Sequence, residues 1–101
     1  MAQVTVIYNT PADEAAFDKY YHETHVPLAK RLPNLRGYTV STGPIQALSG
    51  PAPHLVAILQ FDSMSDIASA LASPEGQAAA ADVANFATGG VTILLHDVKS
   101  V

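Results

Sequence analysis

The chain has 101 residues, enough for one domain spanning residues 1–101 and too few for a second core. Its 9 acidic and 5 basic residues give a formal net charge of −4 at pH 7, and because the basic residues form no patch we expect no binding to nucleic acid. The absence of cysteine excludes disulfides and thiolate chemistry, and no apolar run approaches the roughly 18 residues that a membrane helix needs, so we expect a cytoplasmic protein without membrane contact.

The surface of the folded chain is expected to be short of polar cover. Hydrophobic residues make up 49% of the sequence and charged residues 14%, against a usual charged share of about 25%. A small monomer has much surface for its volume, so this composition favours a homodimer that buries one face. The alternative is a monomer whose apolar share is raised by its alanines.

The N-terminal part of the chain predicts a strand followed by a helix. Residues Val4–Tyr8 are β-branched and aromatic, which is typical of a strand. Thr10 suits the N-cap of the next helix, Pro11 its first position, and Asp13 the closing position of a capping box. The helix then has a stripe at 3.6-residue spacing. Its members are Phe17, Tyr20, Tyr21, Thr24, Leu28 and Leu32.

Pro27 is expected to interrupt this helix. It cannot donate a hydrogen bond to the Glu23 carbonyl, and its ring crowds that carbonyl at a cost of about 3 kcal/mol in a regular helix. We therefore expect a kink or a restart near His25 and Val26, and an end of the helix before Pro33.

The remaining elements complete a strand-helix-strand-strand-helix-strand order. Strands are expected at residues 37–42, 54–61 and 91–98, and helices at residues 65–72 and 74–86, the latter capped by Ser73. This order is the ferredoxin-like βαββαβ arrangement of an α+β fold. A small parallel sheet would need a crossover helix between the second and third strands, and the proline-rich loop at residues 43–53 cannot supply one. Gly89-Gly90 is interpreted as a turn.

The third and fourth strands are apolar on both faces. They read L-V-A-I-L and V-T-I-L-L, whereas a sheet with helices on one face should alternate towards polar residues on the other. The simplest cover for the second face is the same sheet of a second copy. The sequence therefore predicts a ferredoxin-like sandwich that forms a dimeric α+β barrel.

Two segments resemble the EthD family, which is named after a component of a bacterial system that degrades ethyl tert-butyl ether. They are F-D-K-Y-Y-H-E-T-H-V-P-L at residues 17–28, followed by Leu32-Pro33 and Gly37-Tyr38, and S-P-E-G-Q at residues 73–77, followed by Asp82 and Asn85-Phe86. The resemblance implies a dimeric α+β barrel. It also implies either a helper of oxidative degradation or a cofactor-independent dehydratase or cyclase, as in some fungal relatives, and it maps His25 onto the motif histidine.

His25 is the candidate catalytic residue. At about 100° per residue from Phe17, its side chain lies near 80° and borders the buried stripe. One interpretation makes it a general acid/base at the mouth of a pocket between helix and sheet. The other makes it a structural histidine bonded to a carbonyl freed by the kink, and the resemblance favours the first. Burial would lower the pKa of His25, whereas a nearby carboxylate such as Asp18 would raise it.

The substrate-binding candidates are aromatic or lie next to an aromatic residue: Tyr8, Tyr21, Tyr38, Asn85 and Phe86. Buried tyrosine hydroxyls need partners, so they are suited to orient a ligand. Asp18, His22 and His25 share one side of a helix and could bind a metal, but an ordinary solvated pair of Asp18 with His22 explains the spacing better. We therefore predict no metal and no cofactor.

The sequence thus predicts an EthD-like protein that binds a small apolar or aromatic molecule, with His25 moving a proton or with a role in a degradation pathway. Two alternatives remain open at this point. One is a non-catalytic, ligand-binding accessory protein of an oxygenase system, and the other is a structural dimer whose cavity is imperfect packing.

Overall fold

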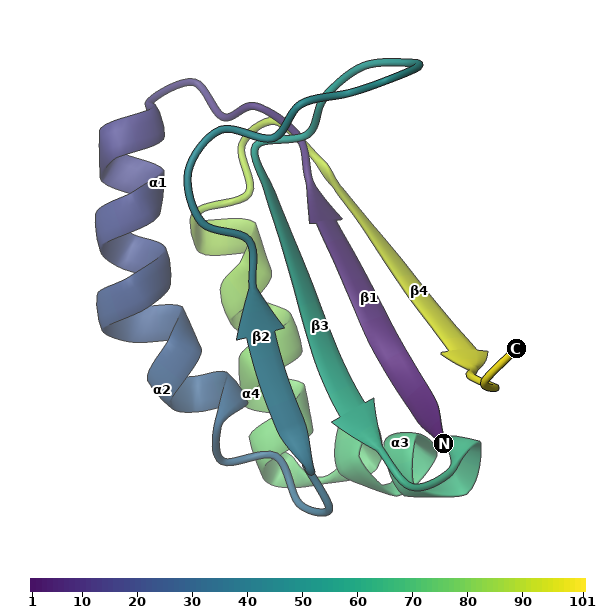
Figure 1. The fold of residues 1–101 in the computed structure, drawn as a ribbon. Helices are drawn as coiled ribbons and strands as arrows, with labels where there is room; N and C mark the ends of the chain where they lie inside the picture. Colours follow the sequence, from purple (N-terminus) through teal and green to yellow (C-terminus); the bar gives the residue numbers. More distant parts are fainter.

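The computed structural model describes residues 1–101 and contains a four-stranded antiparallel sheet in the order β2-β3-β1-β4 (Figure 1). The strands are β1 (Ala2–Tyr8), β2 (Gly37–Val40), β3 (Leu55–Phe61) and β4 (Val91–Asp97). The helices are α1 (Glu14–Tyr20), the π-helical turn η1 (Tyr21–His25), α2 (Val26–Ala29), α3 (Met64–Ala72), α4 (Pro74–Asp82) and the 3₁₀ turn η2 (Val83–Asn85). This is the ferredoxin-like α+β fold predicted from the sequence.

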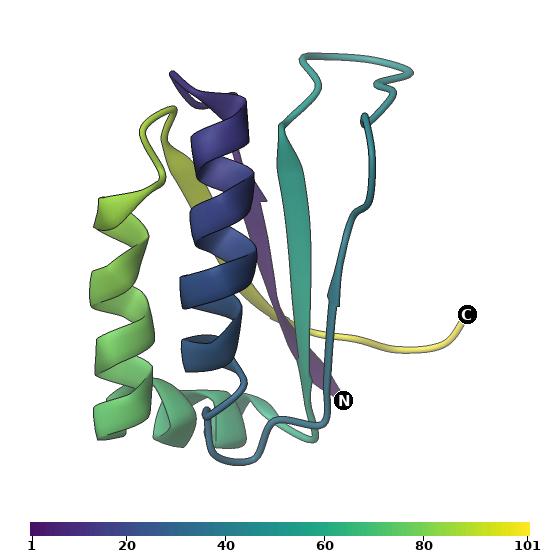
Figure 2. The same ribbon diagram turned by 90° about the vertical axis from the view of Figure 1, so that its left-hand side faces the viewer.

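The helices form one layer and the sheet the other. Figure 2 shows the helix that runs from α1 to α2, together with α4, on one side of the sheet, and no helix on the other side. Helix α3 lies across the lower end of the sheet (Figure 1). No helix is long and apolar enough to span a membrane.

Alternation along the two central strands builds the core. Side chains of a strand point to the two faces in turn, and in β1 and β3 every second residue is buried beneath the helices. These buried residues are Ala2, Val4, Val6, Tyr8, Leu55, Ala57, Leu59 and Phe61. The residues between them lie on the open face and are half-buried.

The first helix begins later than expected. Its N-cap is Asp13, whose Oδ1 accepts a hydrogen bond from the Ala16 N–H at 3.0 Å, so the predicted cap at Thr10 is wrong. The reason lies in the turn before β4, because the Ala12 N–H donates to the Thr88 hydroxyl at 3.0 Å. Residues 9–12 are therefore held outside the helix, and Pro11 is buried instead of starting it.

The interruption expected before Pro27 is present as the π-turn η1. Regular α-helical bonding ends at Tyr20, and the Val26 N–H donates to the carbonyl of Tyr21, five residues earlier. A π-turn adds a residue to one turn and so rotates the residues that follow it. As a result His25 is buried, whereas Thr24 is exposed and its expected place in the buried stripe is wrong.

The second half of the chain follows the expected order with small changes at the ends. Ser73 is the N-cap of α4, and its hydroxyl accepts from the Gly76 N–H at 3.0 Å. The helix ends at Asp82, and the 3₁₀ turn η2 covers the rest of the expected range. Gly76 lies against the backbone of Ala70 and Leu71 so closely that a Cβ would collide with it. This glycine lets α4 pack directly against the end of α3.

Candidate functional site

A small pocket lies between the helix layer and the sheet. Its volume is about 90 Å³, and 14 of its 16 lining residues are hydrophobic. The other two are His25 and Gly76. The floor comes from β1, β2 and β3, and the walls come from η1, α2 and α4. Leu71 and Ile93 lie at its rim, where they are 38% and 50% exposed. Small-ligand sites commonly combine such apolar walls with a few polar groups.

His25 is placed in this pocket by the π-turn and is only 6% exposed. Its Nδ1 lies 3.0 Å from Oδ2 of Asp82, which is itself 8% exposed. Burial holds the pKa of His25 below its ordinary value despite the opposing effect of Asp82, because burial disfavours the charged ring. The imidazole is therefore neutral near pH 7.

Asp82 is the centre of a hydrogen-bond network. Its Oδ1 accepts from the Tyr20 hydroxyl at 2.6 Å and from Nδ2 of Asn85 at 3.0 Å. Burial alone would raise the pKa of Asp82, but the hydrogen bonds from Tyr20, Asn85 and His25 outweigh it and hold the pKa below its ordinary value. An ionised carboxylate can only accept, so Nδ1 of His25 carries the proton and Nε2 keeps its lone pair. Nε2 has no partner within the chain.

Sequence reasoning missed the role of Asp82. The carboxylate expected beside His25 was Asp18, but the one present comes from α4, 57 residues further along the chain. A signal existed in the sequence, since Asp82 is the single charged residue after four successive alanines in α4. A carboxylate on an otherwise apolar helix end is more often paired than solvated when it faces a core.

Three tyrosines line the same pocket. The hydroxyl oxygens of Tyr21 and Tyr38 lie 2.6 Å apart, and the ring of Tyr8 packs edge-on against the ring of Tyr21. Burial raises the pKa of Tyr8, Tyr21 and Tyr38 above the ordinary tyrosine value. All three hydroxyls therefore remain protonated at physiological pH.

The predicted site residues thus fall into two groups. His25, Tyr8, Tyr21 and Tyr38 line the pocket. Asn85 and Phe86 lie behind it: Asn85 binds Asp82, and the buried Phe86 ring packs 4.8 Å from the His25 ring, centroid to centroid. Ligand binding by any of these residues stays a prediction.

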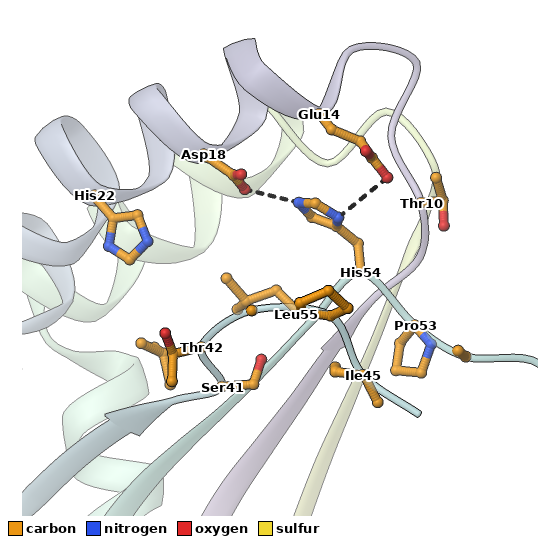
Figure 3. A pocket seen from close by; sticks show the side chains of 14 residues that line it. Thr10, Glu14, Asp18, His22, Ser41, Thr42, Ile45, Pro53, His54 and Leu55 are labelled. Carbon is orange, nitrogen blue, oxygen red and sulfur yellow. Dashed lines mark hydrogen bonds and ion pairs between the residues drawn. The ribbon is translucent and has the colours of Figure 1, made fainter. Parts of the chain in front are cut away.

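A second, open cleft lies between α1 and the loop before β3 (Figure 3). Its volume is about 770 Å³, and only 4 of its 14 lining residues are hydrophobic. Nε2 of His54 lies 2.7 Å from Oδ1 of Asp18, and Nδ1 lies 3.6 Å from Oε1 of Glu14. The expected pair of Asp18 with His22 is therefore wrong, because Asp18 bonds to His54 instead. Two members of the metal alternative also have different partners, since Asp18 bonds to His54 and His25 bonds to Asp82.

The buried pocket, rather than the open cleft, is the candidate functional site. Its lining includes the neutral His25, which bonds to the ionised Asp82 behind the wall, and both residues are buried and have shifted pKa values. Such shifted groups on a pocket wall are typical of functional sites. In the open cleft the two carboxylates are more than half exposed.

The pH dependence of stability follows from His25. Its pKa is about 6.5 when unfolded and lower when folded, so below neutral pH the unfolded chain binds the proton first. The free energy of unfolding should therefore fall as the pH is lowered from about 7.5 through 6.5 and level off below the folded pKa. Urea denaturation of the wild type and of His25→Gln across this range tests it. The fall should be smaller in the variant, and equal slopes would contradict the assignment.

Comparisons with known proteins agree with this fold. The EthD domain model matches residues 9–90. An uncharacterized 11.0 kDa protein in the thcB-thcC intergenic region of Rhodococcus erythropolis is 48% identical over 103 aligned residues, which cover all of this chain and 98% of the relative.

Two solved structures are also similar. An ethyl tert-butyl ether degradation (EthD) family protein of Bacillus halodurans is 26% identical, with a TM-score of 0.89 over 98% of this chain and 99% of that one. A dimeric ferredoxin-like protein of Thermobifida fusca shares the fold at 13% identity, with a TM-score of 0.70 over 96% of this chain and 90% of that one. The domain match, the curated relative and the Bacillus structure together show that the chain belongs to the EthD family.

Proposed function

We propose that the protein binds a small apolar or aromatic molecule in the pocket between helix and sheet and that His25 moves a proton to or from it without a cofactor. The observation that carries this proposal is the buried His25–Asp82 pair, joined at 3.0 Å, whose histidine lines an otherwise apolar pocket. Such a pair is costly to bury for packing alone, since removing charged groups from water is unfavourable.

The pair is arranged for acid–base work. Neutral His25 offers the lone pair of Nε2, and Asp82 holds the ring in that tautomer through Nδ1. When Nε2 takes up a proton, the carboxylate stabilises the imidazolium that forms. Tyr20 and Asn85 fix the carboxylate in turn, so the base is held in one orientation.

The binding part of the proposal is tested by NMR titration with cyclopentanone, a ring small enough for the pocket. Chemical-shift changes are expected at pocket residues of the wild type. Ala79→Leu fills the pocket from α4 and should abolish them, whereas Ala78→Leu adds the same bulk at an exposed position of the same helix and should not. Equal titrations of both variants would contradict binding in this pocket.

A non-catalytic role as an accessory protein of an oxygenase or degradation system is the second candidate. The absence of any lysine or arginine around the pocket fits simple storage or delivery of a neutral molecule. Binding of cyclopentanone without any proton exchange at its carbons would favour this role over acid–base chemistry.

We further propose that two copies pair through the open face of the sheet. Apolar side chains lie on that face at Ile7, Val56, Ile58 and Leu94, and Leu94 is 46% exposed. Burying them removes apolar surface from water at about 25 cal/mol per Å². The similar Thermobifida structure is described as dimeric, which supports the proposal.

Light scattering tests the pairing. We expect twice the monomer mass of 10.6 kDa at micromolar concentration. Leu94→Lys should give the monomer mass, because it places a charge in the interface. Leu95→Lys changes the next residue of β4, which points to the helix side, and should leave the dimer intact. A wild-type monomer would overturn the proposal.

A further inference from the structure

The side chains of Tyr8, Tyr21 and Tyr38, here called the tyrosine cluster, line one pocket from three different elements. Tyr8 is the last residue of β1, Tyr21 opens the π-turn, and Tyr38 lies in β2. Tyr8 is only 1% exposed, yet its hydroxyl has no hydrogen-bond partner within the chain. No enclosed side-chain oxygen or nitrogen lacks a partner, so this hydroxyl borders the open space of the pocket.

The tyrosine cluster has more O–H donors than its internal hydrogen bond uses. Three hydroxyls carry three protons, and the bond between Tyr21 and Tyr38 uses one of them. The hydroxyl that accepts in that bond keeps its own proton, and Tyr8 keeps another. Two O–H donors therefore remain for an acceptor inside an otherwise apolar pocket.

We propose that the tyrosine cluster holds the carbonyl oxygen of the substrate, and that the substrate is a small, neutral, enolisable carbonyl compound. This inference rests on the proposed function, because it supplies the group on which His25 acts. His25 and the tyrosine cluster then contact different atoms of the substrate. Nε2 of His25 contacts the carbon next to the carbonyl, and the cluster contacts the carbonyl oxygen.

The step is balanced without a further reactant. The Nε2 lone pair takes a proton from the carbon next to the carbonyl, the C–H electron pair becomes a C=C bond, and the carbonyl π pair moves to the oxygen. The two free hydroxyls donate to this developing enolate, and donors placed where charge develops lower the barrier. The imidazolium then returns the proton to the same carbon or to a conjugated one. Nothing is oxidised or reduced.

The charge around the pocket favours a neutral substrate. No lysine or arginine lines it, and the nearby Asp82 is ionised. A phosphate or carboxylate group would enter an apolar space beside a fixed negative charge without a cation to pair with, which is strongly unfavourable. The protonated hydroxyls of the cluster suit an uncharged oxygen that gains charge only during the reaction.

The test measures exchange of the cyclopentanone α-protons for deuterium in D₂O by ¹H NMR, with binding followed separately by titration. Wild type should accelerate exchange over buffer. Tyr8→Phe keeps the ring and removes one donor, and should lower the rate about 100-fold while the ketone still binds. The double variant Tyr21→Phe/Tyr38→Phe should have a similar effect. Tyr38→Phe alone leaves the Tyr21 hydroxyl free to donate, so this variant should lose far less of the exchange rate.

The outcomes separate this inference from the proposed function. Unchanged exchange in Tyr8→Phe and in the double variant would overturn the role of the cluster. Wild type that binds cyclopentanone without exchange would overturn the substrate class and leave binding intact. Wild type that does not bind the ketone would overturn both.

Discussion

Replacing Asp82 by alanine is expected to lower the free energy of unfolding by about 2–3 kcal/mol, because the buried Nδ1–H of His25 loses its acceptor. Tyr20 and Asn85 lose the same acceptor, although Asn85 is exposed and can turn to water. Asp82→Asn keeps one acceptor oxygen and should cost less. Since the pKa of Asp82 is held low, the carboxylate contributes above about pH 4 and its contribution is lost on further acidification.

Urea denaturation measures this effect, and the surface offers a matched control. Asp62 pairs with Arg36 at 2.9 Å, but both side chains are more than half exposed. Such surface ion pairs contribute about 0–1 kcal/mol, so Asp62→Ala should be nearly neutral. Equal losses in Asp82→Ala and Asp62→Ala would show that the buried network does not stabilise the fold.

His25→Gln is expected to lower the rate of cyclopentanone exchange by about 100- to 10,000-fold, the usual contribution of a positioned general base. Glutamine can still bond to Asp82 but has no basic nitrogen, so the fold and the pocket should remain. His54→Gln is the matched control, since His54 also pairs with a carboxylate but lies in the open cleft. Circular dichroism and light scattering should show both variants folded.

Two results would contradict the assignment to His25. Equal exchange rates for His25→Gln and wild type would remove its role as the base. A larger loss in His54→Gln than in His25→Gln would move the chemistry to the open cleft.

The fold could be predicted because each element carries its own local signal. Examples are the β-branched run of β1, the proline-rich loop before β3 and the cap at Ser73. Each of these signals lies within a short stretch of the sequence. The cap of α1 was misplaced because the Thr88 hydroxyl, 76 residues away, binds the Ala12 N–H. The sequence around Ala12 does not indicate that contact.

The candidate site was predicted only in part for the same reason. The aromatic residues and His25 could be found from helical spacing and from the family resemblance. The π-turn that buries His25 and exposes Thr24 could not, because Pro27 indicates a break without fixing its form. The choice of Asp82 as partner depends on how α4 packs beside η1, which is a property of the tertiary structure.

The state of the His25 ring at the pocket wall tests the central claim most directly, and ¹⁵N NMR of the labelled imidazole measures it. We expect a neutral ring at pH 7 with the proton on Nδ1, a pKa below about 6.5, and a shift of the Nε2 resonance when cyclopentanone is added. A ring that is charged at pH 7 or that carries its proton on Nε2 would contradict the account. So would an Nε2 resonance that does not shift when the ketone binds.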